Sequence, residues 1–167
     1  MPTGPAARTT DAVAHPLPPV LTPGPGSVTV LIGFLPAWRG LPLAAAGALM
    51  GAKTASDVAI TTAMAATVAA AGTPGAPAAY AAEQVAKGAC LAAMSSAISG
   101  AAAGGTDIHA CTTPYPVPPH GPGVVITGSA TVLINFMPAC RMGDTILEAI
   151  GPPNTISMGC MTVIIGG

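Results

Sequence analysis

The composition of this 167-residue chain excludes several classes of protein before any motif is considered. Five basic and six acidic residues give a formal net charge of −1, so the chain has no basic surface on which to hold nucleic-acid phosphates. The length suits one domain, or a small domain with an insertion, and 21 glycines and 19 prolines favour short strands joined by tight turns.

The N-terminal segment, residues 1–26, is rich in proline and contains no apolar run that would serve as a secretory signal. The four cysteines are not spaced as in a small disulfide framework. We therefore expect a protein made in the reducing cytoplasm with free thiols. Any export would use a route that reads no N-terminal signal.

One short phrase occurs three times along the chain and predicts three equivalent strands. Residues 26–33 read Gly-Ser-Val-Thr-Val-Leu-Ile-Gly, residues 128–135 read Gly-Ser-Ala-Thr-Val-Leu-Ile-Asn, and residues 159–166 read Gly-Cys-Met-Thr-Val-Ile-Ile-Gly. Such β-branched runs between glycines are typical of short, buried strands bounded by turns. The third copy carries Cys160 where the others carry Ser27 and Ser129, which suggests a pseudo-threefold object with one special site.

A second repeated phrase, Pro-Ala-x-Arg, is followed by aspartates at matching positions. The arginines are Arg8, Arg39 and Arg141, and the aspartates are Asp11, Asp107 and Asp144. Their spacing indicates a repeat of roughly 31 residues that is split by an insertion of roughly 70 residues. Because repeated aspartates more often cap turns than catalyse, we expect structural pairs with the arginines.

The insertion, residues 40–105, is rich in alanine and is divided by Gly-Thr-Pro-Gly at residues 72–75. This pattern predicts two helices, about 43–71 and about 77–100, folded as a hairpin. The uninterrupted apolar stretches, Val58–Ala71 and Ala89–Ala103, are shorter than the roughly 20 residues of a transmembrane helix. We expect the hairpin to pack on its own protein or on a partner. Insertion into a membrane is the alternative, because small residues also line membrane-helix interfaces.

Three histidines, His15, His109 and His120, lie in connections rich in proline and glycine. Imidazoles with one thiolate form a common tetrahedral zinc site, and a thin β structure gains stability from a metal that links its loops. Two cysteines compete for the fourth place. We favour Cys160 over Cys111, because a ligand only two residues from His109 is sterically harder to place around the same ion.

An enzyme is not expected from these residues. The sequence contains no glycine-rich phosphate loop and no nucleophile elbow. A zinc hydrolase needs an open coordination position for water, whereas three histidines and one cysteine would close the site.

Together these phrases resemble the PAAR-repeat proteins, whose Pro-Ala-Ala-Arg stands here at residues 5–8. The resemblance covers residues 1–39 and 106–167, and it includes Gly-Pro-Pro-Asn at residues 151–154. It implies a mainly β fold, a small pseudo-threefold cone of short strands that is discontinuous in sequence, with the helical hairpin of residues 40–105 inserted. Phe34 and Phe136 depart from the pattern, because glycine is common at those positions.

The resemblance also implies a role and a metal site. PAAR-repeat proteins cap the trimeric VgrG-like spike of contractile injection machines such as type VI secretion systems, one tip per trimer, and sharpen it for membrane puncture. Their zinc is held near the point by three histidines and a cysteine, which correspond here to His15, His109, His120 and Cys160. Such a protein would stay in the cytoplasm until firing and then reach the target cell, contacting its membrane transiently. The alternative is an effector whose helical insert acts on membranes or recruits cargo or a chaperone, with the cone as carrier.

Overall fold

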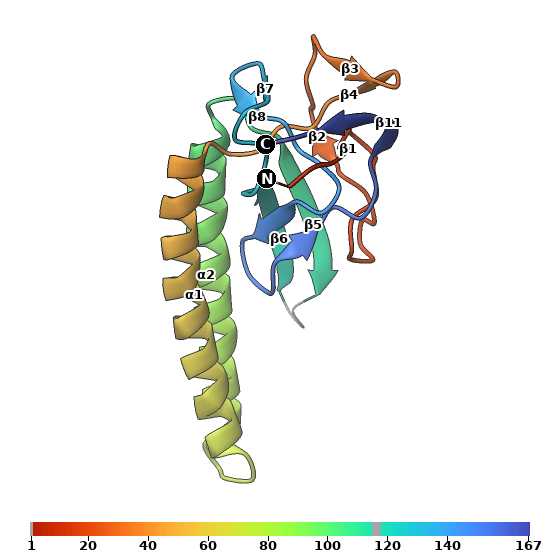
Figure 1. Ribbon diagram of the computed structural model, residues 1–167. Coiled ribbons are helices and arrows are strands. Elements are labelled where there is room, and N and C mark those ends of the chain that lie inside the picture. The colour runs from red at the N-terminus through yellow and green to blue at the C-terminus, as the bar shows by residue number, and fades with distance from the viewer. Residues whose placement is uncertain (1, 115–117) are drawn as a thin grey trace.

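The computed structural model describes residues 2–114 and 118–167. Two long helices lie beside a group of short strands and extend past the strands at one end (Figure 1). The helices are α1 (Leu43–Ala70) and α2 (Ala76–Ala102). The strands are β1 (Gly4–Ala6), β2 (Pro23–Gly24), β3 (Leu31–Ile32), β4 (Leu35–Pro36), β5 (Ile108–Pro114), β6 (Pro119–Val125), β7 (Leu133–Ile134), β8 (Met137–Pro138), β9 (Thr145–Glu148), β10 (Asn154–Thr155) and β11 (Cys160–Ile165).

The helical hairpin confirms the prediction from the alanine-rich insertion. Alanine has the highest helix propensity, and Pro77 stands in the first turn of α2, where its missing N–H leaves no bond unmade. On α1 the buried positions include Ala46, Leu49, Lys53 and Ile60, a spacing that keeps them on one face of the helix.

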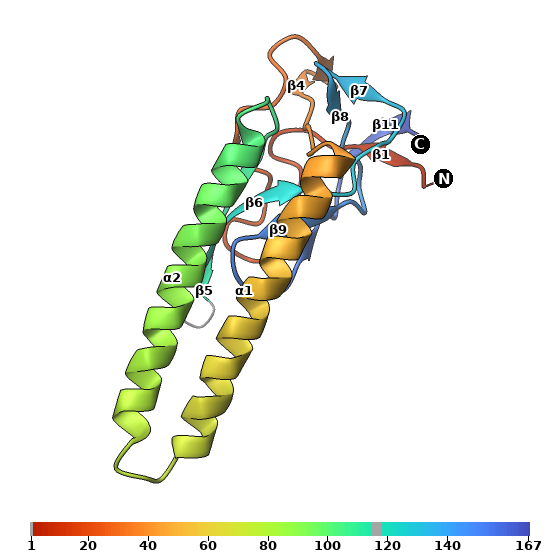
Figure 2. The same cartoon turned by 90° about the vertical axis from the view of Figure 1, so that its left-hand side faces the viewer.

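The largest sheet contains five antiparallel strands in the order β10-β9-β6-β5-β2. The two helices cover one face of this sheet (Figure 2), where Leu49 and Ile98 pack against Val124. The next residue, Val125, faces the opposite side and joins a second cluster around Trp38, because side chains alternate along a strand. The sheet is therefore buried on both faces.

A closed ring of backbone hydrogen bonds joins the three Pro-Ala-x-Arg phrases at their third positions, which are Ala7, Trp38 and Cys140. Ala7 N–H donates to Cys140 O at 2.9 Å, Cys140 N–H donates to Trp38 O at 3.1 Å, and Trp38 N–H donates to Ala7 O at 2.9 Å. All three residues are buried. This cyclic pattern shows that the repeats close around a common pseudo-threefold axis.

The three predicted Arg–Asp pairs are confirmed. Arg8 and Asp11 approach to 2.7 Å, Arg39 and Asp107 to 2.8 Å, and Arg141 and Asp144 to 3.1 Å. The first and third pairs are local, whereas the whole helical hairpin lies between Arg39 and Asp107 in the sequence. In each pair the arginine's own backbone N–H also donates to the aspartate, so each carboxylate holds a turn closed.

The repeated strand phrases differ from the expectation that they are buried. One isoleucine of each copy points inward, at 8%, 7% and 5% exposure for Ile32, Ile134 and Ile165. The residue before it points outward, at 60%, 56% and 61% exposure for Leu31, Leu133 and Ile164. The expectation of burial was wrong for the outward residues. Side chains alternate between the two sides of a strand, and only one side of these strands faces the core.

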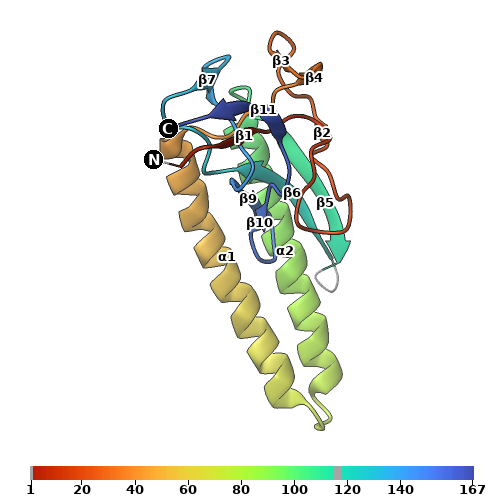
Figure 3. The same ribbon diagram turned by 45° about the vertical axis from the view of Figure 1, so that its right-hand side comes forward.

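These outward residues share one end of the molecule. The β3–β4 and β7–β8 hairpins and β11 lie at the end opposite the turn between α1 and α2 (Figures 1 and 3). We call the exposed apolar side chains of these elements, together with Val28 in the segment that leads into β3, the base face. They are Val28, Leu31, Phe34, Leu133, Phe136, Met161 and Ile164.

Candidate metal centre

Three strands and one loop bring the histidines together. His109 and Cys111 lie on β5, His120 on β6 and Glu148 on β9, while His15 is in the loop after β1. His109 and Cys111 are two positions apart on one strand, so the pleat places both on the same face of the sheet. We call these five residues the histidine cluster.

The cluster is compact and buried. His15 Nε2 lies 2.7 Å from His109 Nε2 and 3.2 Å from Glu148 Oε1. The other carboxylate oxygen, Glu148 Oε2, lies 2.5 Å from His120 Nδ1. Cys111 also belongs to it, because ligand atoms of His15, Cys111 and Glu148 all lie within 4.8 Å of one another. His109 and Glu148 are fully buried.

Two glycines make room for these side chains. In the sheet His109 pairs with Gly123, which pairs on its other side with Glu148. A Cβ at Gly123 would lie 3.1 Å from Glu148 Cγ, and a Cβ at Gly151 would lie 2.8 Å from His120 Nε2. Glycine at both positions therefore permits the close approach of an imidazole and a carboxylate.

Burial of His109 and His15 lowers their pKa values and so favours the neutral form that binds metals. It lowers the pKa of His109 to about 4, with a further contribution from the charge of His15. Burial also lowers the pKa of His15, although the charge of Glu148 opposes that shift. Burial raises the pKa of the Cys111 thiol, so a metal would have to displace its proton.

The donor set fits a divalent metal of the zinc type. Imidazole nitrogen, thiolate sulfur and carboxylate oxygen are all ordinary zinc ligands. In the part of the chain that the structure describes, the Nδ1 atoms of His15 and His109 are buried without a hydrogen-bond partner. A hollow of about 190 Å³, lined by His15, His120 and Glu148 among others, leads to the cluster.

Cys160 lies elsewhere, with the symmetry-equivalent residues Ser27 and Ser129. Its thiol packs among Ile32, Ile134 and other small apolar side chains, and its Sγ lies 3.3 Å from Thr162 Oγ1, which lowers the thiol pKa. The structure thus joins His15, His109 and His120, as expected, but does not bring Cys160 to them. Threefold symmetry explains this placement, since it keeps Cys160 at the level of the two serines.

Sequence reasoning underrated Cys111 and missed Glu148. The expectation assumed a short loop around His109, whereas the structure has an extended strand there, on which Cys111 lies within 4.8 Å of ligand atoms of His15 and Glu148. A signal for Glu148 was present in the sequence, because this carboxylate ends the otherwise apolar strand Thr-Ile-Leu-Glu. A buried charge at such a position requires partners.

Comparison with known proteins gives a family match in the C-terminal part of the chain. The PAAR motif family matches residues 115–167. No curated protein and no solved structure gives a significant match to the chain. The resemblance to PAAR-repeat proteins is therefore confirmed over residues 115–167, where this chain carries a PAAR motif.

Proposed function

We propose that this protein is the tip of a contractile secretion system, a non-catalytic cap that docks through its base face on a trimeric VgrG-like spike. The PAAR motif supports a spike-tip role. The single observation that carries the docking surface is the threefold repetition of exposure in the base face. A trimeric partner presents three equivalent surfaces to a ligand on its axis, so its tip needs three equivalent contacts.

The base face meets this requirement with apolar groups. Leu31, Leu133 and Ile164 repeat the same exposure in the three copies, and Phe34 and Phe136 add aromatic rings exposed at 94% and 88%. Exposed apolar patches mark interaction surfaces, and aromatic side chains supply much of the binding energy at protein interfaces.

We further propose that the histidine cluster holds one zinc ion. His15, His109, Cys111 and either His120 or Glu148 would be its ligands, and the remaining residue would orient them. The ion would supply a cross-link between the loop after β1 and the central sheet, in place of the large core that such short strands cannot form. The cluster would serve stability, with the metal enclosed by protein side chains.

Co-purification with a trimeric spike tests the docking. We expect the wild-type chain to bind at one copy per trimer, and Leu133→Lys to weaken binding by about tenfold or more, because it buries an unpaired charge. Val68→Lys, a comparable change on the distant hairpin, is the matched control. Equal binding by Leu133→Lys and wild type would refute docking through the base face.

A further inference from the structure

We propose that the free end of the helical hairpin, residues 58–82, inserts into the acyl region of a lipid bilayer. This end contains the turn between α1 and α2 and lies opposite the strands of the base face (Figures 1 and 3). A tip docked through its base face would therefore present the hairpin turn first. That orientation rests on the proposed function, whereas insertion itself is a property of the hairpin.

The charges of the hairpin are arranged as in a membrane protein. No charged residue occurs between Asp57 and Glu83. The bordering charges are paired within each helix, Lys53 with Asp57 and Lys87 with Glu83. Three of these four charges, Lys53, Glu83 and Lys87, are only 5%, 7% and 1% exposed, whereas the side chain of Asp57 is 49% exposed. A helix in water turns its charges outward, whereas a helix in lipid turns them inward and pairs them.

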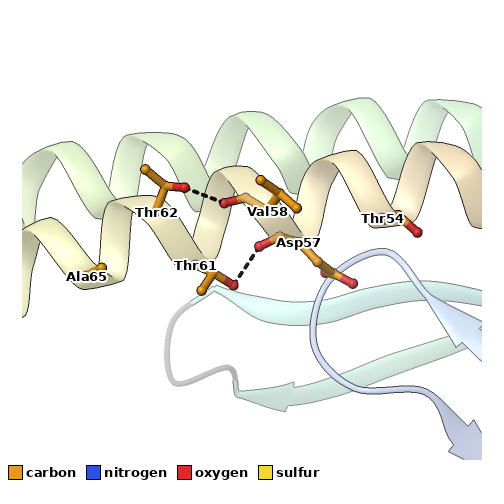
Figure 4. Close-up of a pocket in the computed structure, with 6 residues that line it drawn as sticks. All are labelled: Thr54, Asp57, Val58, Thr61, Thr62 and Ala65. Atoms are coloured by element: carbon orange, nitrogen blue, oxygen red, sulfur yellow. Dashed lines mark hydrogen bonds between the residues drawn. The ribbon is translucent and has the colours of Figure 1, made fainter.

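The threonine hydroxyl groups of the free end are satisfied without water. Thr61 Oγ1 donates to Asp57 O at 2.7 Å, and Thr62 Oγ1 donates to Val58 O at 2.8 Å (Figure 4). Thr67 donates to the carbonyl of Ala63, and Thr73 at the turn donates to that of Ala70. Such bonds to the preceding helical turn are how threonine is accommodated in hydrocarbon.

Apolar side chains occupy the exposed surface that these polar groups leave. Val58, Val68 and Tyr80 are 62%, 75% and 55% exposed, and Val85 just beyond them is 72% exposed. By length and composition α2 as a whole, Ala76–Ala102, is apolar enough to cross a membrane, although only its first residues, 76–82, belong to the free end. Exposed apolar side chains such as Val68 and Tyr80 mark a surface for a membrane or a partner.

The length of the free end sets the depth of insertion. The first turn of the free end lies against the strands, because Ile60 is only 2% exposed. At 1.5 Å per residue, the part of α1 beyond it, residues 62–70, reaches about 14 Å, less than the roughly 30 Å of a hydrocarbon core. The rest of the hairpin is held to the sheet, through Met94 and Ile98 on α2 and through Lys53 Nζ, which donates to Gly151 O at 2.9 Å. The folded protein would thus insert a wedge rather than a full span.

Lipid is favoured over a protein partner because Lys53, Glu83 and Lys87 are turned inward and paired, as charges are in a membrane, and residues 58–82 contain no charged side chain. The same absence predicts a specific behaviour. Binding should not require anionic lipid and should resist salt, unlike that of basic surface helices.

Flotation of the full-length protein with phosphatidylcholine vesicles tests the proposal. We expect wild type to float, at both low and high salt, and Val68→Lys to lower the partition by about tenfold or more, because its ammonium would enter hydrocarbon. Val28→Lys is the matched control, since Val28 is 85% exposed on the base face. It should leave flotation unchanged, and circular dichroism should show equal helix content in all three proteins.

Several outcomes would overturn the proposal. One is wild type that stays with the soluble fraction. Another is wild type that floats only with phosphatidylglycerol at low salt, which would indicate adsorption to the surface. A dimer of wild type that Val68→Lys dissociates, without flotation, would assign the same surface to a second copy. Spike binding separates the two proposals, because Val68→Lys should retain the spike and Val28→Lys should lose it.

Discussion

Replacing the two base-face phenylalanines by glycine should make the protein more stable and less able to bind its spike. Phe34 and Phe136 adopt φ values of 68° and 67°, in two-residue connections whose first residues, Gly33 and Asn135, also have positive φ. Two such residues in succession form the type I′ turn preferred by tight hairpins, and it favours glycine. Phe34 and Phe136, which stand where glycine is common in PAAR-repeat proteins, therefore have a strained backbone.

The magnitude follows from two opposing terms. A left-handed conformation costs a residue with a Cβ roughly 1–2 kcal/mol. The greater freedom of glycine in the unfolded chain offsets roughly 0.4–1 kcal/mol of the gain. Since the rings are 94% and 88% exposed, their removal forfeits little burial. Each replacement should gain about 0.8 kcal/mol, so the double variant Phe34→Gly, Phe136→Gly should gain about 1.6 kcal/mol, which raises the melting temperature of a chain of this size by about 3–6 °C.

Thermal unfolding and spike binding are the two measurements. Loss of two aromatic anchors should weaken binding by about thirtyfold or more. Thr10 is the matched control, because it has a φ of 69° but is not part of the base face. Thr10→Gly should also stabilise the fold, while spike affinity stays unchanged. A double variant that melts lower than wild type, or that binds the spike equally well, would refute this reasoning.

Three further predictions concern the cluster and the repeats. Elemental analysis should find about one zinc per chain, lowered by Cys111→Ser but not by Cys160→Ser, and the reverse result would restore Cys160 as the ligand. The free energy of unfolding of metal-free protein should fall as pH falls from about 6.5 to about 4, by up to about 1.4 kcal/mol per pH unit. The reason is that histidine in the unfolded chain binds a proton in this range, whereas buried His109 does not. A wild-type denaturant midpoint that stays constant over this range, like that of His109→Gln, would contradict the prediction. Asp107→Asn should cost about 3 kcal/mol in urea unfolding, because it leaves Arg39 without its carboxylate, and a loss below about 1 kcal/mol would show that the pair is dispensable.

The helices and the symmetry could be predicted from the sequence because both depend on local signals. Alanine propensity and a single Gly-Thr-Pro-Gly turn defined α1 and α2 almost to the residue. Repeated spacing revealed the pseudo-threefold relation without any contact being known. The three histidines were identified because few other residues of the chain could hold a metal.

The burial of the strand residues could not be predicted, because it depends on which side of each strand faces the core. A continuous run of apolar residues does not show which side that is. Leu31 and Ile32 are equally hydrophobic, yet one lies on the base face and the other in the core. The same ambiguity applies to Cys160, whose place along the axis could not be known from the sequence. The repeat relates Cys160 to Ser27, and the structure places Cys160 in the apolar cluster around Ile32 and Ile134. The histidine cluster lies elsewhere in the fold, and the cysteine near it is Cys111 on β5.

The position of the insertion explains how a three-repeat fold tolerates it. Arg39 and Asp107 take the places that Arg141 and Asp144 hold in the third repeat, and Asp107 N–H donates to Arg39 O at 3.1 Å, as Asp144 N–H does to Arg141 O. Thr106 Oγ1 donates to Gly40 O at 3.1 Å, so the two ends of the insertion meet. The ordinary turn is thus rebuilt from residues on either side of the hairpin, and the loop-closure entropy of the insertion grows only slowly with its length. Because the junction reproduces the native turn, the hairpin can project from the fold without disturbing the ring of Ala7, Trp38 and Cys140, which leaves its free end available for lipid.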